Sequence, residues 1–560
     1  MTTIAAEPVT EPDGADRPST LCHAFARNVR DRGPQLALRS LGGARTWTWE
    51  EYGAAVDRAA GSLAALGVQR GDRVAFLARN LPELLLAETA TVQLGAAGVA
   101  LYTTSPAPVL QHVLADCAPT ALLVEQGLEE RLSGVQHEVR HVIGLDGPLR
   151  LGPPLAEVDA PAGFDLERRS REVTPDDLLG ILYTSGTTGA PKGVEWQHGR
   201  MLQALDAFTA AWPEGPDVSD LSVGPFGHAG ERGLGHWRGH LVGATRTACP
   251  DTAQLPAALL DARPTFLFGS PQLWQAVRSL ALARATTDER AVLEATLRAE
   301  PADGDALAGL RERLGLDRLD RAVTAAAPCP LALQRFIHAL GLPFGEFYGM
   351  TEIAAAVQTR PGPDDLGTVG VPLTGVEVRT AVDGEVLVRG PRARGYRNLP
   401  EETAAVFGTD GWTRTGDVGE IDEHGRLRLV DRKREIIISA SGHNTAPAPI
   451  EAAVKGECPL IGQVCVVGDG RPHNTALVTL APGVEPGGDT HAAVAAAIGR
   501  VNAVLDSRER IVAHTVLAEP WLPGSDELTE TGKLRRRRIA TRHADAVRRL
   551  YALPPWGCLQ

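Results

Sequence analysis

Residues 181–194 read ILYTSGTTGAPKGV, which joins the end of an apolar strand to a polar, glycine-containing loop. The small and hydroxyl residues of this loop are Thr184, Ser185, Gly186, Thr187, Thr188 and Gly189, and Lys192 follows them. Glycines let backbone N–H groups approach a ligand, hydroxyls donate to phosphate oxygens, and a lysine supplies a point charge. The spacing does not fit the GxxxxGK[ST] pattern of a Walker loop. The segment predicts a different loop that wraps a polyphosphate, because a flexible Ser/Thr/Gly linker would explain neither the strand nor the lysine.

Lysine is scarce in this chain, which makes each lysine informative. Four of the 56 basic residues are lysines, namely Lys192, Lys433, Lys455 and Lys533, and the rest are arginines. Residues 535–538 are all arginine, so this segment accepts the planar guanidinium freely. Lysine at position 533 therefore indicates a task for a compact ammonium. The arginine run itself is expected to be a solvated helix face, although it could also meet the phosphates of a ligand.

The composition is that of a globular protein with an acidic balance. The chain has 560 residues, 43% of them hydrophobic and 22% charged, which as a prior corresponds to two to four domains. A net charge of −13 argues against a nucleic-acid binder and against binding to an anionic membrane surface. The seven cysteines are scattered and form no CxxC pair, so neither a disulfide framework nor a zinc site is expected.

Two stretches bear on localisation. Residues 1–20 are acidic and contain prolines, without the basic and apolar regions of a signal peptide, so we expect a disordered tail. Residues 89–115 carry no Asp, Glu, Lys or Arg, but polar residues and prolines interrupt them. A buried strand, turn and helix is therefore preferred to a membrane span. We predict no membrane span and a cytoplasmic protein.

Strands and helices alternate through the first two thirds of the chain. Residues 46–66 combine a strand with a helix that carries an apolar stripe, and residues 84–104 combine a helix with a strand. Apolar strand-like runs recur as far as residue 348. This alternation predicts an α/β fold with layered, mostly parallel sheets covered on both faces. Residues 281–320 are expected to form a helical surface insertion. From about residue 367, short alternating runs between glycine turns indicate antiparallel strands in a small β-barrel-like part. A smaller α+β segment follows from about residue 435.

Four more motifs follow the phosphate loop in order. They are EFYGMTE (346–352), GWTRTGD (411–417), VDRKREIII (430–438) and LTETGKLRRR (528–537). Together with residues 181–194 they closely resemble the motifs of the adenylate-forming superfamily, which contains acyl-CoA synthetases, carrier-protein-loading adenylation domains and beetle luciferases. The resemblance spans about residues 45–540. Within the superfamily, HAGERG (228–233) and TAAAP (324–328) look most like fatty-acyl and related CoA ligases.

The resemblance implies an AMP-forming acid–CoA ligase that uses ATP, Mg²⁺ and coenzyme A. A carboxylate attacks the α-phosphate of ATP, and a thiol then attacks the acyl-adenylate. The implied organisation is a disordered tail at 1–20, a nucleotide- and acyl-binding domain at 21–431, a hinge at 432–434 and a small mobile domain at 435–560. The domain would rotate about Arg434, presenting Lys533 for adenylation and the Gly442 loop for thioester formation.

The resemblance also assigns roles on the nucleotide side. Glu352 and Thr184 would hold Mg²⁺, and Lys192 would contact the phosphates. Asp417 would accept hydrogen bonds from both ribose hydroxyls, with Arg432 as the second ribose contact. The remaining nucleotide-binding positions would be Ser185, Gly186, Thr187, Thr188, Gly189, Ala326, Ala327, Pro328, Tyr348, Gly349, Met350, Thr351 and Gly442, with Tyr348 stacked on adenine. Taken alone, Asp417 can also be interpreted as a turn residue and Arg432 as part of a solvated charged face.

On the acyl side, Lys533 would contact the carboxylate and the α-phosphate during adenylation. His228 would lie near the carboxylate and the route of the CoA thiol, although a lone histidine often has only a structural role. Three positions depart from the superfamily pattern and would border the acyl and adenylate pocket. Ala325 stands where Gly is usual, Phe347 where a small residue is common, and Ile353 where Thr, Ser or Asn is usual.

These departures predict a reshaped hydrophobic pocket and a bulky hydrophobic carboxylic acid, either a fatty acid or a polycyclic acid. Three alternatives remain open. The protein could mainly convert a supplied acyl-adenylate to the thioester, or it could load a separate carrier protein. A luciferase-like oxygenase would share the adenylation step. A nucleotide-binding regulator without turnover is disfavoured, because Lys192, Glu352, Asp417 and Lys533 are all present.

Overall fold

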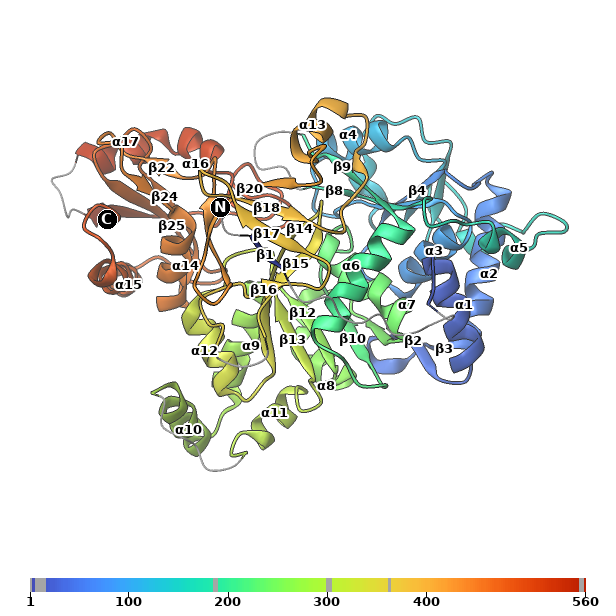
Figure 1. Cartoon of the computed structure of the whole chain (residues 1–560), viewed down its shortest axis with the longest axis horizontal. Coiled ribbons are helices and arrows are strands. Elements are labelled where there is room, and N and C mark those ends of the chain that lie inside the picture. Colours follow the sequence, from blue (N-terminus) through green and yellow to red (C-terminus); the bar gives the residue numbers. More distant parts are fainter. Residues whose placement is uncertain are drawn as a thin grey trace.

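Two mostly parallel sheets build the N-terminal region (Figure 1). The computed structural model describes residues 3–5, 17–184, 190–298, 305–360, 364–552 and 558–559. The first sheet has seven strands in the order β19-β9-β8-β5-β4-β6-β7, and β9 is antiparallel to both of its neighbours. Its strands are β4 (Arg73–Leu77), β5 (Ala97–Ala100), β6 (Ala121–Val124), β7 (His141–Gly144), β8 (Leu178–Tyr183), β9 (Gly193–Gln197) and β19 (Gly395–Tyr396).

The second sheet has nine strands in the order β16-β15-β14-β13-β12-β10-β11-β2-β3. Strands β2 and β10 to β14 run parallel, and antiparallel strands complete both edges. Its strands are β2 (Leu36–Ser40), β3 (Thr46–Thr48), β10 (Ser219–Ser222), β11 (Thr245–Ala248), β12 (Phe266–Gly269), β13 (Arg321–Thr324), β14 (Phe344–Met350), β15 (Ala354–Gln358) and β16 (Val371–Pro372).

Helices cover these sheets. Strands β5 and β6 are buried along their whole length, as expected for parallel strands with both faces covered. Helix α2 (Trp49–Ala65) begins at a capping box formed by Thr48 and Glu51. The other helices of this region are α1 (Leu21–Arg32), α3 (Pro82–Gln93), α4 (Ala107–Cys117), α5 (Leu166–Arg171), α6 (His198–Ala211), α7 (Arg238–Val242), α8 (Leu255–Ala262), α9 (Pro271–Arg284), α12 (Leu331–Ala339), α13 (Pro400–Val406), the π-helix η4 (Gly230–Trp237), and the short 3₁₀ helices η1 (Leu41–Gly43), η2 (Glu129–Leu132), η3 (Leu155–Glu157) and η5 (Thr252–Gln254).

The predicted insertion is helical and lies at the periphery of the molecule (Figure 1). It contains α10 (Thr287–Leu297) and α11 (Ala308–Leu314). Leu293 of α10 and Leu310 and Leu314 of α11 are buried in the core that also contains residues of α9 and α12. The charged side chains predicted from the sequence therefore cover only the outer face of this segment.

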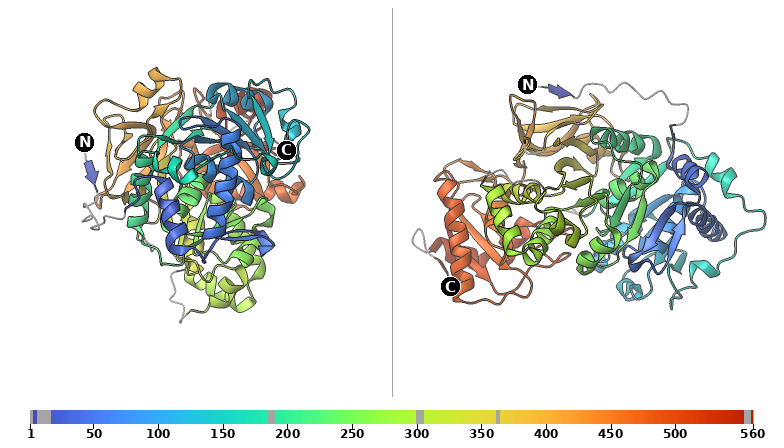
Figure 2. Two further views of the ribbon diagram at one scale, coloured as in Figure 1. Left: turned by 90° about the vertical axis from the view of Figure 1, so that its right-hand side faces the viewer. Right: turned by 90° about the horizontal axis from the view of Figure 1, so that it is seen from below.

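An antiparallel five-stranded sheet follows, as the alternating pattern after residue 367 predicts. Its strands, in order, are β1 (Thr3–Ala5), β17 (Glu377–Thr380), β18 (Glu385–Arg389), β20 (Thr413–Ile421) and β21 (Leu427–Arg432). The prediction of a disordered tail is wrong for Thr3–Ala5, because these residues pair with β17. Figure 2 shows this strand beside the five-stranded sheet and far from α1. The open edge of β17 supplies backbone partners, and Ile4 packs on the core.

The C-terminal region is a small α+β unit beside the nine-stranded sheet (Figure 1). A four-stranded sheet contains β24 (Ile461–Val467), β25 (Asn474–Leu480), β26 (Ile511–Leu517) and β27 (Cys558–Leu559), and a hairpin contains β22 (Ile437–Ile438) and β23 (Asn444–Thr445). Its helices are α14 (Pro447–Glu457), α15 (Gly488–Val504), α16 (Arg536–Arg542) and α17 (Ala544–Ala552). The α/β class and the α+β C-terminal region agree with the prediction. None of the helices in the described ranges is both long enough and apolar enough to cross a bilayer.

Candidate active site

The predicted phosphate loop connects two paired strands. Tyr183, the last residue of β8, lies opposite Gly193, the first residue of β9. The Thr184 N–H donates to the Lys192 carbonyl at 3.0 Å, and the Lys192 N–H donates to Thr184 Oγ1 at 3.3 Å. These bonds close the neck of the loop and fix Thr184 and Lys192 at its base. The predicted phosphate contacts Ser185, Gly186, Thr187, Thr188 and Gly189 lie outside the described residues.

Glu352 occupies a tight turn between β14 and β15. A side chain at Gly349 would place its Cβ 1.7 Å from the Ala354 carbonyl oxygen, so this turn requires glycine there. The Tyr396 hydroxyl donates to Glu352 Oε1 at 2.5 Å. Burial raises the pKa of the Glu352 carboxyl. The carboxylate is therefore held in one orientation, and a bound cation would stabilise its charged form.

Tyr396 also connects Glu352 to the phosphate loop. The Lys192 ammonium lies 5.1 Å from the centroid of the Tyr396 ring, a cation–π contact. A hydrogen bond also connects β9 to this turn, because Trp196 Nε1 donates to the Thr351 carbonyl at 2.8 Å. Met350 and Thr351 are partly buried in the same turn. The predicted lysine and the predicted metal ligand thus share one aromatic neighbour.

Asp417, Arg432 and Tyr348 form the predicted ribose and adenine corner. Asp417 on β20 lies directly opposite Arg432 on β21. Arg432 Nε lies 2.7 Å from Asp417 Oδ1, and the Tyr348 hydroxyl donates to Asp417 Oδ2 at 2.7 Å. Each carboxylate oxygen therefore has a neighbour from a different strand, which fixes the plane of the carboxylate.

Lys533 reaches this corner from the C-terminal region. Its pKa is lowered to about 8, first by burial and then by the charge of Arg432, while the charges of Asp417 and Glu352 act in the opposite direction. At pH 7 the ammonium is still mostly protonated. The structure thus brings Lys533 into the field of the other predicted groups, although Arg432, the nearest of them in sequence, lies 101 positions earlier. Of its arginine neighbours, Arg536 pairs instead with Glu435 and Glu451.

His228 lies just before the π-helix η4, which begins at Gly230. Burial and the nearby charge of Lys533 lower its pKa to about 4, so the imidazole is neutral at pH 7. The Gly230 N–H donates to Nδ1 at 3.1 Å, which places the ring proton on Nε2. His228 therefore has a fixed tautomer and offers one N–H donor.

The three departures from the superfamily pattern are all buried in one apolar cluster. Ala325, Phe347 and Ile353 are respectively 5%, 7% and 2% exposed. The Phe347 ring centroid lies 5.6 Å from that of Phe208 on α6 and 5.8 Å from that of Phe268 on β12. Phe347 thus fills space between these elements with aromatic surface.

Other predicted residues lie at the rim. Ala326 has a left-handed φ of 73°, and Ala327 and Pro328 are exposed in the loop after β13. Arg434 lies in the exposed turn after β21. Gly442, with φ of 80°, lies at the exposed tip of the β22–β23 hairpin.

Sequence reasoning missed two residues that border the site, Tyr396 and Glu530. Tyr396 lies in GYRNLPEET, between two recognised motifs, where a single tyrosine carries no chemical signal. Glu530 lies within the LTETGK motif, and its glutamate among smaller polar residues was the available signal.

Comparison with known proteins decides the family. The family model described as AMP-binding enzyme matches residues 25–397, and that of the AMP-binding enzyme C-terminal domain matches residues 434–553. The chain belongs to the AMP-binding enzyme family. The resemblance to the adenylate-forming superfamily is thereby confirmed, and with it the prediction of an enzyme of the acyl-CoA synthetase class.

Relatives named as fatty-acid–CoA ligases match the chain, and solved structures share its fold. The chain is 37% identical over 436 residues to fadD11 of Mycobacterium tuberculosis, named as a fatty-acid–CoA ligase, covering 70% of this chain and 76% of the relative. It is 30% identical over 551 residues to the long-chain-fatty-acid–CoA ligase FadD15 of Mycobacterium bovis, covering 88% and 90%. The anthranilate CoA ligase AuaEII, solved with anthranoyl-AMP, superposes with a TM-score of 0.73 at 20% identity over 96% of this chain and 100% of that one. The A domain of a carboxylic acid reductase from Segniliparus rugosus gives 0.76 at 21% identity, covering 95% and 94%.

Proposed function

We propose that the chain joins a bulky hydrophobic carboxylic acid to coenzyme A through an acyl-adenylate, with release of AMP. The observation that carries this proposal is the corner in which Asp417 pairs with Arg432 and Tyr348, with Glu352 held by Tyr396. The buried Lys533 lies in the field of Arg432, Asp417 and Glu352. Adenylation needs positioning and charge neutralisation, and these side chains supply both. The relatives named as fatty-acid–CoA ligases support the same reaction.

In the first half-reaction the chain's own residues would bind ATP and neutralise the charge of its phosphates. Asp417 and Arg432 would hold the ribose, and Tyr348 would lie against the adenine. Protonated Lys533 would neutralise charge between the carboxylate and the α-phosphate. Lys192 and the loop that it closes would hold the outer phosphates.

Glu352 and Thr184 would hold Mg²⁺. The donor chemistry fits, because a buried carboxylate with one oxygen fixed by Tyr396 offers the hard ligand that this ion prefers. Within the described ranges no cluster of three or more acidic, histidine or cysteine side chains could hold a metal ion by itself. That also fits, since Mg²⁺ is commonly bound by one or two carboxylates together with substrate phosphates and water. When bound, the ion would neutralise phosphate charge.

In the second half-reaction the domain at 435–560 would rotate about the hinge at 432–434. Lys533 would leave the site, and the Gly442 hairpin, exposed in the present arrangement, would approach the thiol route. Neutral His228 would donate its Nε2–H near the reacting carbonyl. Arg434 lies in an exposed turn directly after β21, where a change of backbone angles would redirect the domain that follows.

The substrate class follows from the apolar cluster around Ala325, Phe347 and Ile353. Their larger apolar side chains favour a hydrophobic acid over a polar one. The decisive test is mass spectrometry of the products formed from ATP, coenzyme A and a panel of hydrophobic acids. Acyl-CoA and AMP are expected. Acylation only of an added carrier protein, or an oxidised product, would replace this proposal with one of its alternatives.

A second candidate is an enzyme that mainly converts a supplied acyl-adenylate to the thioester. The tight packing of Ala325 and Phe347 favours it, because a shift of about 1 Å in a bound group can cost on the order of 100-fold in an in-line reaction. Acid-dependent pyrophosphate exchange and CoA-dependent consumption of synthetic acyl-adenylate should then differ strongly. The double substitution Ala325→Gly with Ile353→Thr should raise the exchange. Robust exchange that the double variant does not raise contradicts this candidate.

A further inference from the structure

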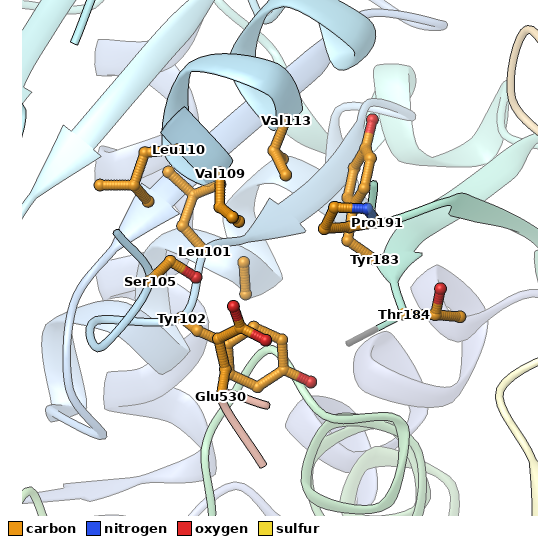
Figure 3. A pocket seen from close by; sticks show the side chains of 11 residues that line it. Leu101, Tyr102, Ser105, Val109, Leu110, Val113, Tyr183, Thr184, Pro191 and Glu530 are labelled. Atoms are coloured by element: carbon orange, nitrogen blue, oxygen red, sulfur yellow. The ribbon is translucent and has the colours of Figure 1, made fainter. Parts of the chain in front are cut away.

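Glu530 enters the N-terminal region from the loop that carries Lys533. It lines a small cavity together with Leu101, Tyr102, Ser105, Thr184 and Pro191, among others (Figure 3). The same loop packs closely on its neighbour, since a Cβ at Gly524 would lie 2.6 Å from the Thr104 carbonyl oxygen. The Glu530 side chain therefore becomes buried because the loop docks here.

The docked carboxylate is compensated at one of its two oxygens only. The Glu530 side chain is 2% exposed, and Oε1 forms one hydrogen-bonded ion pair, at 3.3 Å, with Nη2 of the buried Arg535. Oε2 is buried and has no hydrogen-bond partner among the described residues. The surrounding cavity is mostly apolar, and the charge of Glu530 contributes, after burial, to raising the pKa of the Tyr102 hydroxyl. Burying a charge with an unpaired oxygen is costly, and the cost disappears when the loop returns to water.

Glu530 and Lys533 dock as one unit. The Thr529 N–H donates to the Lys533 carbonyl at 2.8 Å, and the Lys533 N–H donates to Thr529 Oγ1 at 3.0 Å. These two bonds close the turn that contains Glu530. Lys533 therefore cannot enter the site without the burial of Glu530 a turn away.

We infer that Glu530 is a positioning residue for adenylation, whose buried carboxylate opposes the docking of Lys533 and so sets the balance between the two half-reactions. This inference rests on the proposed function for the meaning of the two positions of the loop. The phosphate site adds to the effect. Thr184 and Pro191, which flank the phosphate loop, line the same cavity, so bound polyphosphate would place like charge near Glu530.

The test compares Glu530→Gln with Asp526→Asn. Both substitutions remove one negative charge from the same loop, but Asp526 is exposed and pairs with Arg538 and Arg542. Three quantities are measured: acid-dependent pyrophosphate exchange, CoA-dependent consumption of synthetic acyl-adenylate, and hydrogen-exchange protection of residues 100–105. Glu530→Gln should raise exchange on the order of tenfold and increase the protection, because the amide keeps an oxygen acceptor for Arg535 and removes the unpaired carboxylate oxygen. Consumption of the adenylate should stay level or fall, and Asp526→Asn should change none of the three.

Unchanged protection in Glu530→Gln overturns the inference, and so does exchange that stays level or falls. A fall together with a higher Mg²⁺ requirement would instead make Glu530 a ligand of the metal–phosphate complex. Glu530→Met, which is similar in length and uncharged, should repeat the direction of Glu530→Gln if the amide variant folds poorly. Failure of the proposed function can be distinguished from failure of this inference. Even if no acid supports pyrophosphate exchange, the docking of the loop is still measured by the hydrogen-exchange protection of residues 100–105.

Discussion

The two halves of the site are held in different ways. On the N-terminal side, Asp417 is tied to Arg432 and Tyr348, and Glu352 is tied to Tyr396, by bonds between neighbouring strands and loops. On the C-terminal side, Lys533 is placed by the docking of one loop, which also buries an incompletely paired glutamate. Under the proposed function, the fixed half would serve binding, and the delivered half would serve a step that ends once the adenylate has formed.

Removal of the Lys533 ammonium should produce the largest difference between the two half-reactions. Lys533→Ala should lower acid-dependent pyrophosphate exchange on the order of 100-fold or more, because it removes preorganised positive charge. Consumption of supplied acyl-adenylate should change little, since Lys533 would be away from the site in that step. Arg538→Ala, which removes an exposed cation from the same segment, is the matched control. Equal losses in both half-reactions would contradict the assignment of Lys533 to one step.

The two half-reactions should also differ in their dependence on pH. Under the proposed function Lys533 would act as the protonated ammonium. Because its pKa is lowered to about 8, adenylation should fall by about tenfold per pH unit above that value. An unperturbed lysine would keep its proton to about pH 10. Consumption of supplied adenylate should lack this falling limb. Lys533→Arg should be slower but flat over the same range, because arginine does not titrate there. If Lys533→Arg kept the same fall in adenylation rate above pH 8, that fall would come from another titrating group.

The docking contact itself can be weakened without touching a charge. In Gly524→Ala, the new Cβ would meet the Thr104 carbonyl oxygen at 2.6 Å, so adenylation should fall about tenfold while adenylate consumption is retained. Gly483→Ala is a close control, because its φ of 81° matches the 82° of Gly524 but no atom lies within 4 Å of its Cβ position. Both variants carry the strain of a left-handed alanine, and only the first should alter the half-reaction ratio.

The smallest effect should come from the fixed half. Tyr396→Phe removes the hydroxyl that holds Glu352 but keeps the ring beneath Lys192. Adenylation should fall about fivefold, in line with the loss of one hydrogen bond, and should need more Mg²⁺ for half-maximal rate. Tyr551→Phe, which removes a hydroxyl bonded to the Val467 and His473 carbonyls, should do neither. An unchanged Mg²⁺ titration in Tyr396→Phe would separate Glu352 from the metal.

Much of this could be predicted from the sequence because the chemistry restricts residue type. A polyphosphate loop needs hydroxyls, glycines and a cation after a strand, and Lys533 stands out beside four arginines. The alternation of strands and helices predicted the layered α/β fold for the same kind of reason, since covered parallel strands must be apolar. The ordering of Thr3–Ala5 was not predictable in this way, because the partner of this strand, β17, lies more than 370 residues along the chain.

The sequence by itself determined the enzyme class and most of the candidate residues, because motif spacing and side-chain chemistry are local properties. The tertiary structure alone decided which of them act on one another. The register that sets Asp417 opposite Arg432, the contact between Tyr396 and Glu352, and the burial of Glu530 all join segments distant in sequence. Burial and register depend on how those segments pack, and the electrostatic cost of a charge depends on burial far more than on its neighbours along the chain.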